Sequence, residues 1–434
     1  MSNKHKALFH TFGCKLNFAE TATIARLFSE EGVESVEKGD VPDIIVINSC
    51  SVTAEADRKC RSFIRGLNRK YPDAAILVTG CYAQLKPQEL AALNGVEVVA
   101  GINNKLALVE YARNLTPGDD VRVEVPEAKS LTEFMPSCSR GDRTRYFLKV
   151  QDGCDYWCTY CTIPKARGRS RSGSIEEIVQ QAQRAAAEGG KEIVLTGVNI
   201  GDFGKGTDKA FIDLCRALDK IEGIERYRIS SIEPNLLTDE LIEFVANSER
   251  FMPHFHIPLQ NGSDEVLKLM RRRYDTSLFA SKIAKVRKEL PDAFIGVDLI
   301  VGARGETEEE FMKSKDFVEG LDISHLHVFS YSERPGTKAL EIGHVVDQHE
   351  KSVRSAIMHE VSSRKHRTFA ERFLGTVRPA LLEHSFPGKP LGGFTDNYLR
   401  VEVELPQKYD NTMVNVRLDK LKDDGETFVA SLAE

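Results

Sequence analysis

Three cysteines stand close together near the middle of the chain, Cys154, Cys158 and Cys161, in a C-x3-C-x2-C pattern. Thiolates are soft ligands that select zinc or iron–sulfur clusters. A zinc site needs a fourth cysteine or histidine nearby, and the next histidine along the chain is His254. Three thiolates instead fit a [4Fe–4S] cluster with one open iron, which can bind and reduce a ligand. The alternative is three metal-free cysteines in a loop, an arrangement prone to oxidation.

A second set of cysteines, Cys14, Cys50 and Cys81, is spread along the N-terminal part of the chain. Each follows a predicted strand, and these strands are Lys6–Phe12, Asp43–Asn48 and Ala74–Thr79. Because the carboxyl ends of parallel strands share one edge of a sheet, the three thiols are expected to converge there. The placement favours a second three-ligand [4Fe–4S] cluster. Three unrelated buried cysteines are the alternative.

Composition places the chain among ordinary soluble proteins of two to four domains, with 434 residues, 41% hydrophobic and 29% charged. No secretory signal or membrane-spanning run is seen, so we expect a cytoplasmic protein without a membrane partner. Nine cysteines, an odd number, suit metal ligation better than a disulfide framework. The net charge of −6 means that a nucleic acid must be met by local basic patches.

Alternating strands and helices predict two α/β units. Residues 1–120 read as a small doubly wound domain, residues 121–145 as a linker, and residues 146–373 as a partial (β/α)6 barrel of TIM-like design. The expected barrel strands are Phe147–Gln151, Glu192–Thr196, Arg226–Ser231, His254–Pro258, Phe294–Val301 and His325–Ser330. The C-x3-C-x2-C loop follows the first of these strands, at the end where such barrels carry their chemistry.

Polar residues and glycines follow the other barrel strands. They are Thr196, Gly197 and Asn199 after the second strand, Glu233 after the third, Gln260 after the fourth, and Asp298 in the fifth. Each alone can be explained by turn geometry. Their joint placement on one barrel rim favours a ligand site beside the cysteine loop.

Basic residues are dense in two places near the same rim. They are Lys165, Arg167 and Arg169 after the cysteine loop, and Arg271, Arg272 and Arg273 past the fourth strand. A solvated surface is the simple explanation for any one of them. Because both groups flank predicted strand ends, they also suit a polyanion such as RNA at the active rim.

Residues 374–434 change character to short alternating strands, which predicts a small all-β barrel of a kind that often binds oligonucleotides. Turns are marked by Pro387-Gly388, Gly392-Gly393 and Asp424-Gly425. Acidic residues outnumber basic ones in this segment, so its nonspecific attraction to phosphate is expected to be weak.

The C-x3-C-x2-C motif, with Tyr160 before its last cysteine, resembles the radical S-adenosylmethionine (SAM) superfamily. The added contexts of Cys14, Cys50 and Cys81 narrow the resemblance to the methylthiotransferases, and the terminal barrel looks like their TRAM domain. Lys15, in Gly-Cys-Lys-x-Asn, resembles the branch that acts on N6-threonylcarbamoyladenosine beside the tRNA anticodon. One departure is the turn Gly302–Glu306, where Ala303 and Arg304 replace the family's common Phe-Pro.

The resemblance implies two [4Fe–4S] clusters and SAM as cofactors, and a tRNA anticodon stem-loop as substrate. It also implies an electron donor such as flavodoxin or ferredoxin, and a sulfur source. The cluster at Cys154 would reductively cleave one SAM, the second cluster would deliver sulfur, and a second SAM would provide the methyl group. Adenine carbon 2 would thereby exchange C–H for C–S–CH3. Tyr160 and the strand-end residues above would hold SAM.

Three alternatives stay open at this point. In the first, the substrate is isopentenyladenosine in tRNA. In the second, it is a side chain of a ribosomal protein. The third is an Fe–S protein that binds RNA and senses redox state, which predicts RNA binding without cleavage of SAM.

Overall fold

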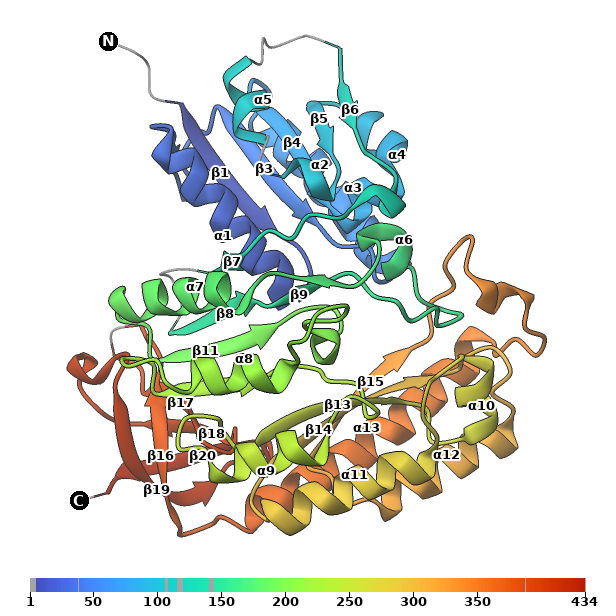
Figure 1. The fold of residues 1–434 in the computed structure, drawn as a ribbon, viewed down its shortest axis with the longest axis vertical. Coiled ribbons are helices and arrows are strands. Elements are labelled where there is room, and N and C mark those ends of the chain that lie inside the picture. Colours follow the sequence, from blue (N-terminus) through green and yellow to red (C-terminus); the bar gives the residue numbers. More distant parts are fainter. Residues whose placement is uncertain are drawn as a thin grey trace.

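The computed structural model describes residues 5–37, 39–105, 108–114, 120–139, 144–386 and 388–433. Three structural units follow one another along the chain, an N-terminal α/β unit, a partial barrel and a small closed β-barrel (Figure 1). This is the α/β architecture predicted from the sequence. In the described part, no helix combines the length and apolar character needed to cross a bilayer.

The N-terminal unit is built on a parallel sheet of order β2-β1-β3-β4-β5-β6. Its strands are β1 (Lys6–Thr11), β2 (Glu34–Ser35), β3 (Ile44–Ser49), β4 (Ala75–Gly80), β5 (Val96–Ala100) and β6 (Arg122–Glu124). Strands β3 and β4 are buried along their whole length, which explains their unbroken apolar sequence. Helices α1 (Lys15–Glu30) and α5 (Leu108–Asn114) cover one face, while α2 (Ala54–Lys70), α3 (Cys81–Leu85) and α4 (Pro87–Ala91) pack on the other.

The segment predicted as a linker carries structure in its described parts. Residues Arg122–Glu124 form the edge strand β6, and β7 (Ser137–Cys138) pairs with β8 (Arg145–Lys149) of the barrel. Strands of two or three residues are too short to leave a period in the sequence. Residues 140–143 of this segment lie outside the described residues.

The partial barrel contains six parallel strands, β8, β11 (Glu192–Thr196), β12 (Arg226–Ile229), β13 (His254–Gln260), β14 (Phe294–Val301) and β15 (His325–Ser330). Two isolated parallel bridges, Tyr227–Phe251 and Ser231–His256, connect the sheet that ends in β12 with the sheet that begins at β13. The outer face packs under α7 (Ile175–Ala187), α8 (Phe211–Leu218), α9 (Asp239–Asn247), α11 (Thr276–Glu289), α12 (Glu308–Gly320) and α13 (Gln348–Glu371), as Figure 1 shows. Side chains alternate, so every second residue of these strands faces the hollow of the barrel.

The C-terminal unit is a closed barrel of order β16-β17-β18-β20-β19. Its strands are β16 (Val377–Leu382), β17 (Leu391–Thr395), β18 (Arg400–Val403), β19 (Met413–Leu421) and β20 (Thr427–Leu432). The prediction of a turn at Gly392-Gly393 is wrong, because both glycines lie within β17. A Cβ on Gly393 would stand 2.3 Å from the Leu381 carbonyl oxygen, so glycine permits a close strand approach there.

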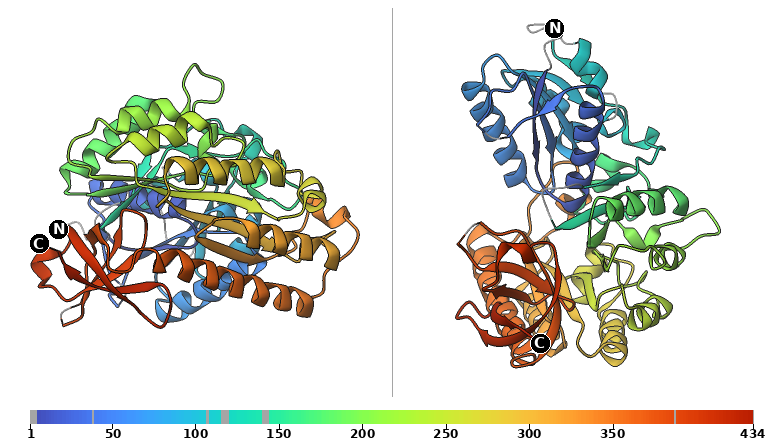
Figure 2. Two further views of the ribbon diagram at one scale, coloured as in Figure 1. Left: turned by 90° about the horizontal axis from the view of Figure 1, so that it is seen from below. Right: turned by 90° about the vertical axis from the view of Figure 1, so that its left-hand side faces the viewer.

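The three units are joined by buried arginines. Arg226 and Arg228 of β12 donate to backbone carbonyls of the C-terminal barrel, including those of Phe394 and Thr395 at 2.9 and 2.7 Å. Arg334, in the loop after β15, pairs with Asp57 of α2 at 2.9 Å. The N-terminal unit therefore sits over the partial barrel, with the C-terminal barrel beside it (Figure 2).

Candidate active site

The three N-terminal cysteines come together at one edge of the sheet. Cys14, Cys50 and Cys81 follow β1, β3 and β4, which are neighbours in the sheet. Gly13 has φ +96°, and a Cβ there would meet the Cys50 sulfur at 2.7 Å, so the Cys14 turn rests directly on Cys50. Cys81 lies near enough to act electrostatically on both other thiols. The convergence expected from strand order is therefore present.

The cysteines of the barrel loop also form one group, and each sulfur accepts a hydrogen bond. The backbone N–H of Tyr156 donates to Cys154 Sγ at 3.3 Å, and that of Ile163 donates to Cys161 Sγ at 3.4 Å. Arg272 donates to Cys158 Sγ at 3.1 Å. Donors aimed at sulfur are the usual surroundings of cluster-ligating thiolates, because they stabilise negative charge there.

Burial and neighbouring thiols raise the pKa of Cys154 and Cys161 to about 12, and burial raises the pKa of Cys50 to about 12 as well. Such thiols stay protonated at neutral pH unless a cation binds them. Among the described residues, no three possible ligands are arranged around a single metal ion.

Arg167 lies between the two cysteine sets. It belongs to the short helix α6 (Ile163–Arg167) directly after Cys161, and its Nε donates to Cys81 Sγ at 3.3 Å. Its guanidinium also pairs with Glu20 at 3.0 Å and Asp152 at 2.9 Å. With 1% of the residue exposed, Arg167 is not an RNA-facing side chain, which corrects that expectation.

The carboxylates that hold Arg167 are part of a buried ionic network between the N-terminal unit and the barrel. Glu20 of α1 also pairs with Lys149 of β8 at 2.9 Å and with Lys105. Burial opposes ionisation, but the cations of Arg167, Lys105 and Lys149 prevail and hold the pKa of Glu20 well below its ordinary value. The network therefore fixes the two units, and the two cysteine sets, relative to each other.

Arg272 is likewise not an RNA contact. Its side chain is 3% exposed and pairs with Glu233, beside Cys158. Burial raises the pKa of Glu233 although Arg272 opposes the shift. Glu233 thus lies next to the barrel cysteines, as predicted, but with an arginine partner that the sequence did not reveal.

The turn after β11 is fixed by Gln151, which the sequence did not single out. Gln151 Oε1 accepts from the backbone N–H of Val198 at 3.0 Å and of Asn199 at 2.7 Å. The turn begins at the buried Thr196, and a Cβ on Gly197 would meet the Gln151 carbonyl oxygen at 2.9 Å. Asn199 is 3% exposed, and both polar atoms of its side chain lack hydrogen-bond partners within the described part of the chain. These atoms fit a polar ligand such as SAM.

Two further predicted positions line the rim at β13 and β14. Gln260 has φ +67° at an irregularity in the pairing of β13 with β14, a strained geometry common at functional sites. Asp298 bonds the His256 ring at 2.7 Å. His256 alternates with buried residues along β13, so its inward direction follows from the strand period.

Tyr160 explains why the unusual fifth-strand turn is tolerated. It packs with Val266 and Met270 against Ala303, which is 3% exposed. Arg304 points away and bonds Glu333 and the Leu340 carbonyl at 2.8 and 3.1 Å. The departure at Ala303-Arg304 is therefore accommodated by packing around Ala303 and by the contacts of Arg304 with the loop that contains Leu340.

Four of the predicted basic residues stay at the surface. Lys165 donates to the Gly336 carbonyl, and Arg169 forms an exposed ion pair with Asp155 at 3.1 Å. Arg273 stacks over the Tyr156 ring at 4.0 Å, and Arg271 is exposed with φ +57°. These side chains border the cysteine loop and remain candidates for RNA contact.

Comparison with family models and curated proteins gives matches over most of the chain. The model of the Radical SAM superfamily matches residues 148–318, and that of Uncharacterized protein family UPF0004 matches residues 6–101. Threonylcarbamoyladenosine tRNA methylthiotransferase MtaB of Bacillus subtilis is 40% identical over 95% of this chain and 93% of its own length. MtaB of Aquifex aeolicus is 36% identical over 92% and 97%. A tRNA-2-methylthio-N(6)-dimethylallyladenosine synthase of Acetivibrio thermocellus is 30% identical over 95% and 88%.

Solved structures with a similar fold include radical S-adenosylmethionine methyltransferase TsrM of Kitasatospora setae. It matches with a TM-score of 0.57 and 15% identity over 77% of both chains. The cobalamin-dependent S-adenosylmethionine radical enzyme OxsB matches with a TM-score of 0.53 and 14% identity over 85% of this chain and 56% of its own. At these identities the likeness concerns the fold alone.

Proposed function

This chain belongs to the tRNA methylthiotransferases of the radical SAM superfamily, and we propose that it converts N6-threonylcarbamoyladenosine in tRNA to its 2-methylthio form. The proposal is supported by the proximity of the two cysteine sets. Arg167 lies in the helix that follows Cys161, and its side chain donates a hydrogen bond to Cys81. A methylthiotransferase needs SAM cleavage and sulfur delivery at one substrate atom. Two neighbouring cluster sites supply both.

The first site would be held by Cys154, Cys158 and Cys161. A [4Fe–4S] cluster held there would supply an open iron for binding SAM and the electron for its reductive cleavage. The protein binds SAM with strand-end polar groups, for which Asn199 and Glu233 are our first candidates. Thr196, Gly197, Gln260, Asp298 and Tyr160 complete the proposed SAM site.

The second site would be held by Cys14, Cys50 and Cys81, and its cluster would be the point of sulfur delivery. Gly13 and Arg167 support this role, because one lets Cys14 approach Cys50 and the other donates to Cys81. A triple Cys14→Ser, Cys50→Ser, Cys81→Ser variant should lose about half of the iron bound per chain while still cleaving SAM. Unchanged iron content would contradict a second cluster.

RNA would be held around these sites by the exposed side chains of Lys165, Arg169, Arg271 and Arg273. We propose that the C-terminal barrel acts as a TRAM-like support for the anticodon stem. Because no side chain of the barrel can supply a low-potential electron, an external donor such as flavodoxin or ferredoxin is required. Sulfur likewise has to come from a separate source.

The test is an anaerobic assay of the reconstituted enzyme with anticodon stem-loops. One RNA carries threonylcarbamoyladenosine and a matched RNA carries dimethylallyladenosine. The proposal predicts a mass gain of one methylthio group on the first RNA. Conversion of only the second RNA would reassign the substrate, and cleavage of SAM without modification of either RNA would contradict a tRNA-directed activity.

A further inference from the structure

A cavity of about 350 Å³ lies in the hollow of the partial barrel, where all three structural units meet. Lys15 contributes from the N-terminal unit, and His254, His256 and His327 contribute from β13 and β15. Tyr398 and Arg400 close it from the C-terminal barrel. A cavity assembled from three units needs the complete chain.

The cavity lies at the start of β13, β14 and β15, and one lining residue connects it to each proposed centre. Lys15 directly follows Cys14, one of the candidate ligands of the second cluster. His256 lines the cavity and bonds Asp298, a candidate of the SAM site, at 2.7 Å. The cavity is therefore linked to the second cluster site through Lys15 and to the SAM site through His256.

Two polar groups of the cavity, the Lys15 side-chain nitrogen and His254 Nδ1, form no hydrogen bond among the described residues, whereas His256 bonds Asp298. Among the described residues, Lys15 forms no hydrogen bond or ion pair, although Arg145 and Arg228 lie near enough to act on it electrostatically. His254 is 8% exposed and its Nδ1 has no hydrogen-bond partner. An unpaired ammonium and an unpaired ring nitrogen in one cavity favour a ligand with anionic and polar atoms.

One wall of the cavity is aromatic and rigid. Tyr398 adopts φ +67° and stacks on Phe394, with ring centroids 4.8 Å apart and an interplanar angle of 22°. The His254 ring approaches Tyr398 at 4.5 Å, and Arg145 lies over Phe394 at 4.5 Å. A strained aromatic residue held by cations and rings suits stacking against a planar, conjugated group.

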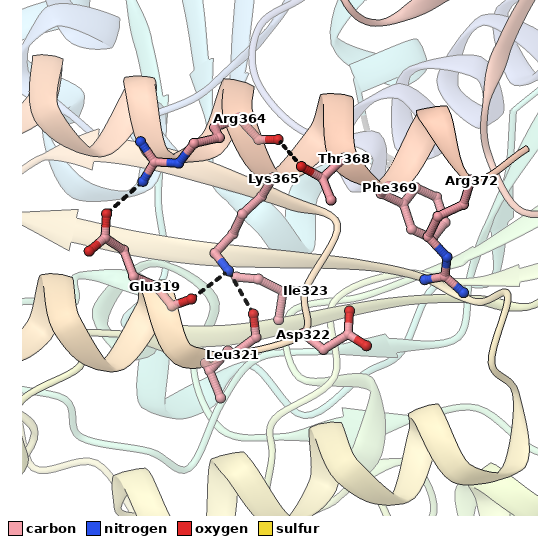
Figure 3. Close-up of a pocket in the computed structure, with 9 residues that line it drawn as sticks. All are labelled: Glu319, Leu321, Asp322, Ile323, Arg364, Lys365, Thr368, Phe369 and Arg372. Atoms are coloured by element: carbon pink, nitrogen blue, oxygen red, sulfur yellow. Dashed lines mark hydrogen bonds and ion pairs between the residues drawn. The ribbon is translucent and has the colours of Figure 1, made fainter. Parts of the chain in front are cut away.

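In the hollow between α12 and α13, by contrast, the cationic side chains of Arg364 and Lys365 have hydrogen-bond partners (Figure 3). Lys365 Nζ there donates to the carbonyls of Glu319 and Leu321 at 3.0 and 2.6 Å. Arg364 pairs with the Glu319 carboxylate at 2.6 Å. The charged groups of this hollow thus bond within it, whereas Lys15 has no such partner among the described residues and shares its cavity with Arg400 and Glu426.

We propose that the cavity is the recognition pocket for the side group on adenine N6, and that Lys15 binds the carboxylate of the threonylcarbamoyl group. This inference rests on the proposed function. Arg400, which has no ion pair within the described part of the chain, assists from the opposite wall. A dimethylallyl group carries no charge or hydrogen-bonding atom, so the same pocket leaves Lys15 unpaired and disfavours it.

The experiment is a cycle that changes the protein and the RNA separately. Binding is measured for wild type and Lys15→Met with a stem-loop carrying threonylcarbamoyladenosine, and with the same stem-loop whose threonyl carboxylate is a methyl ester. Wild type should lose roughly 10-fold or more in affinity with the ester. Lys15→Met should lose most of the preference for the free carboxylate, and Lys15→Arg should keep it. The exposed Lys59→Met is the control and should behave as wild type.

Because Lys15 adjoins Cys14, a second variant keeps the test independent of cluster assembly. Arg400→Gln, on the C-terminal barrel, should reduce the preference for the free carboxylate while iron content stays unchanged. The inference is overturned if both Lys15→Met and Arg400→Gln retain the wild-type preference. If wild type modifies neither RNA, the proposed function fails instead, so the two failures are distinguishable.

Discussion

Asn199 is a buried amide without hydrogen-bond partners in this structure, so it costs stability unless a ligand satisfies it. An unsatisfied buried polar group costs about 1–3 kcal/mol. Asn199→Ala should therefore leave the SAM-free protein as stable as wild type or slightly more stable. It should weaken SAM binding roughly 10-fold. Thermal unfolding and equilibrium binding of SAM to the reconstituted protein measure the two effects.

Asn247→Ala on the exposed side of α9 provides the control and should change neither quantity. Unaltered SAM affinity in Asn199→Ala would remove this residue from the ligand site. A large loss of stability would mean that the amide has partners in the folded protein.

For individual residues, the sequence predicts the candidate cluster ligands better than the side chains that surround them in the fold. The six cysteines could be found because their spacing and strand-end positions carry the signal. Arg167 and Arg272 could not be placed, because alternating cations after a loop look the same whether they meet RNA or buried carboxylates. Their partners Glu20 and Glu233 are remote in sequence, and only the tertiary fold brings them together.

Gly153 shapes the loop that carries the barrel cysteines. It has φ +68°, and a Cβ at this position would stand 2.0 Å from the Arg169 carbonyl oxygen. Gly153→Ala should displace the loop and reduce iron bound at the barrel site, because both backbones would have to move. Gly189→Ala is the matched control, since Gly189 has φ +86° but nothing within 4 Å of its Cβ position.

Both alanine variants should lose about 1–2 kcal/mol of stability from the positive φ. Only Gly153→Ala should lose iron and cluster absorbance. Equal iron content in the two variants would show that the loop tolerates the contact.

Strand β15 carries two histidines that folding keeps neutral. Burial and neighbouring histidines lower the pKa of His325 to about 3 and that of His327 to about 4. An unfolded histidine titrates near 6.5, so the unfolded chain takes up more protons below that pH. Stability is therefore complete above pH ~6.5 and falls between pH ~6.5 and ~4, by up to about 1.4 kcal/mol per pH unit for each ring.

The His327→Gln variant should show a shallower fall in denaturation midpoint between pH 7 and pH 5 than wild type. Exposed His349→Gln should leave the slope as it is. If the pH dependence of stability were identical in all three proteins, the histidines of β15 would not be its cause.

Element positions were largely predictable, because buried parallel strands and amphipathic helices carry strong periods. The expected strands Glu192–Thr196, Phe294–Val301 and His325–Ser330 match β11, β14 and β15 in both bounds. Strands β6 and β7 were missed since they are very short. Strand β17 was missed because its two glycines resemble a turn, although they serve a close strand contact.

The packing of the structural units against each other depends on contacts that cannot be predicted from local sequence patterns. Arg334 and Asp57 are 4% and 3% exposed and pair across the N-terminal unit and the barrel. Arg334→Ala would leave the buried Asp57 carboxylate with only a distant cation, Lys86 at 3.9 Å, so it should cost up to about 3–5 kcal/mol and loosen the N-terminal unit. Calorimetry should show that this unit unfolds at a lower temperature than the barrel.

Adding Asp57→Ala should recover part of that loss, because no unpaired charge then remains. The exposed ion pair of Arg364 provides the comparison, and Arg364→Ala should change stability by about 0–1 kcal/mol. Equal effects of Arg334→Ala and Arg364→Ala would contradict an interdomain role for Arg334.

The proposed modification of threonylcarbamoyladenosine in tRNA can be tested in cells by nucleoside mass spectrometry of total tRNA. Cells lacking this gene should lose the 2-methylthio form and accumulate its precursor. Wild-type protein should restore it, and a Cys154→Ala, Cys158→Ala, Cys161→Ala variant should not. If the 2-methylthio form persists without the gene, the account is contradicted, and if only the dimethylallyladenosine product disappears, the assigned substrate is wrong.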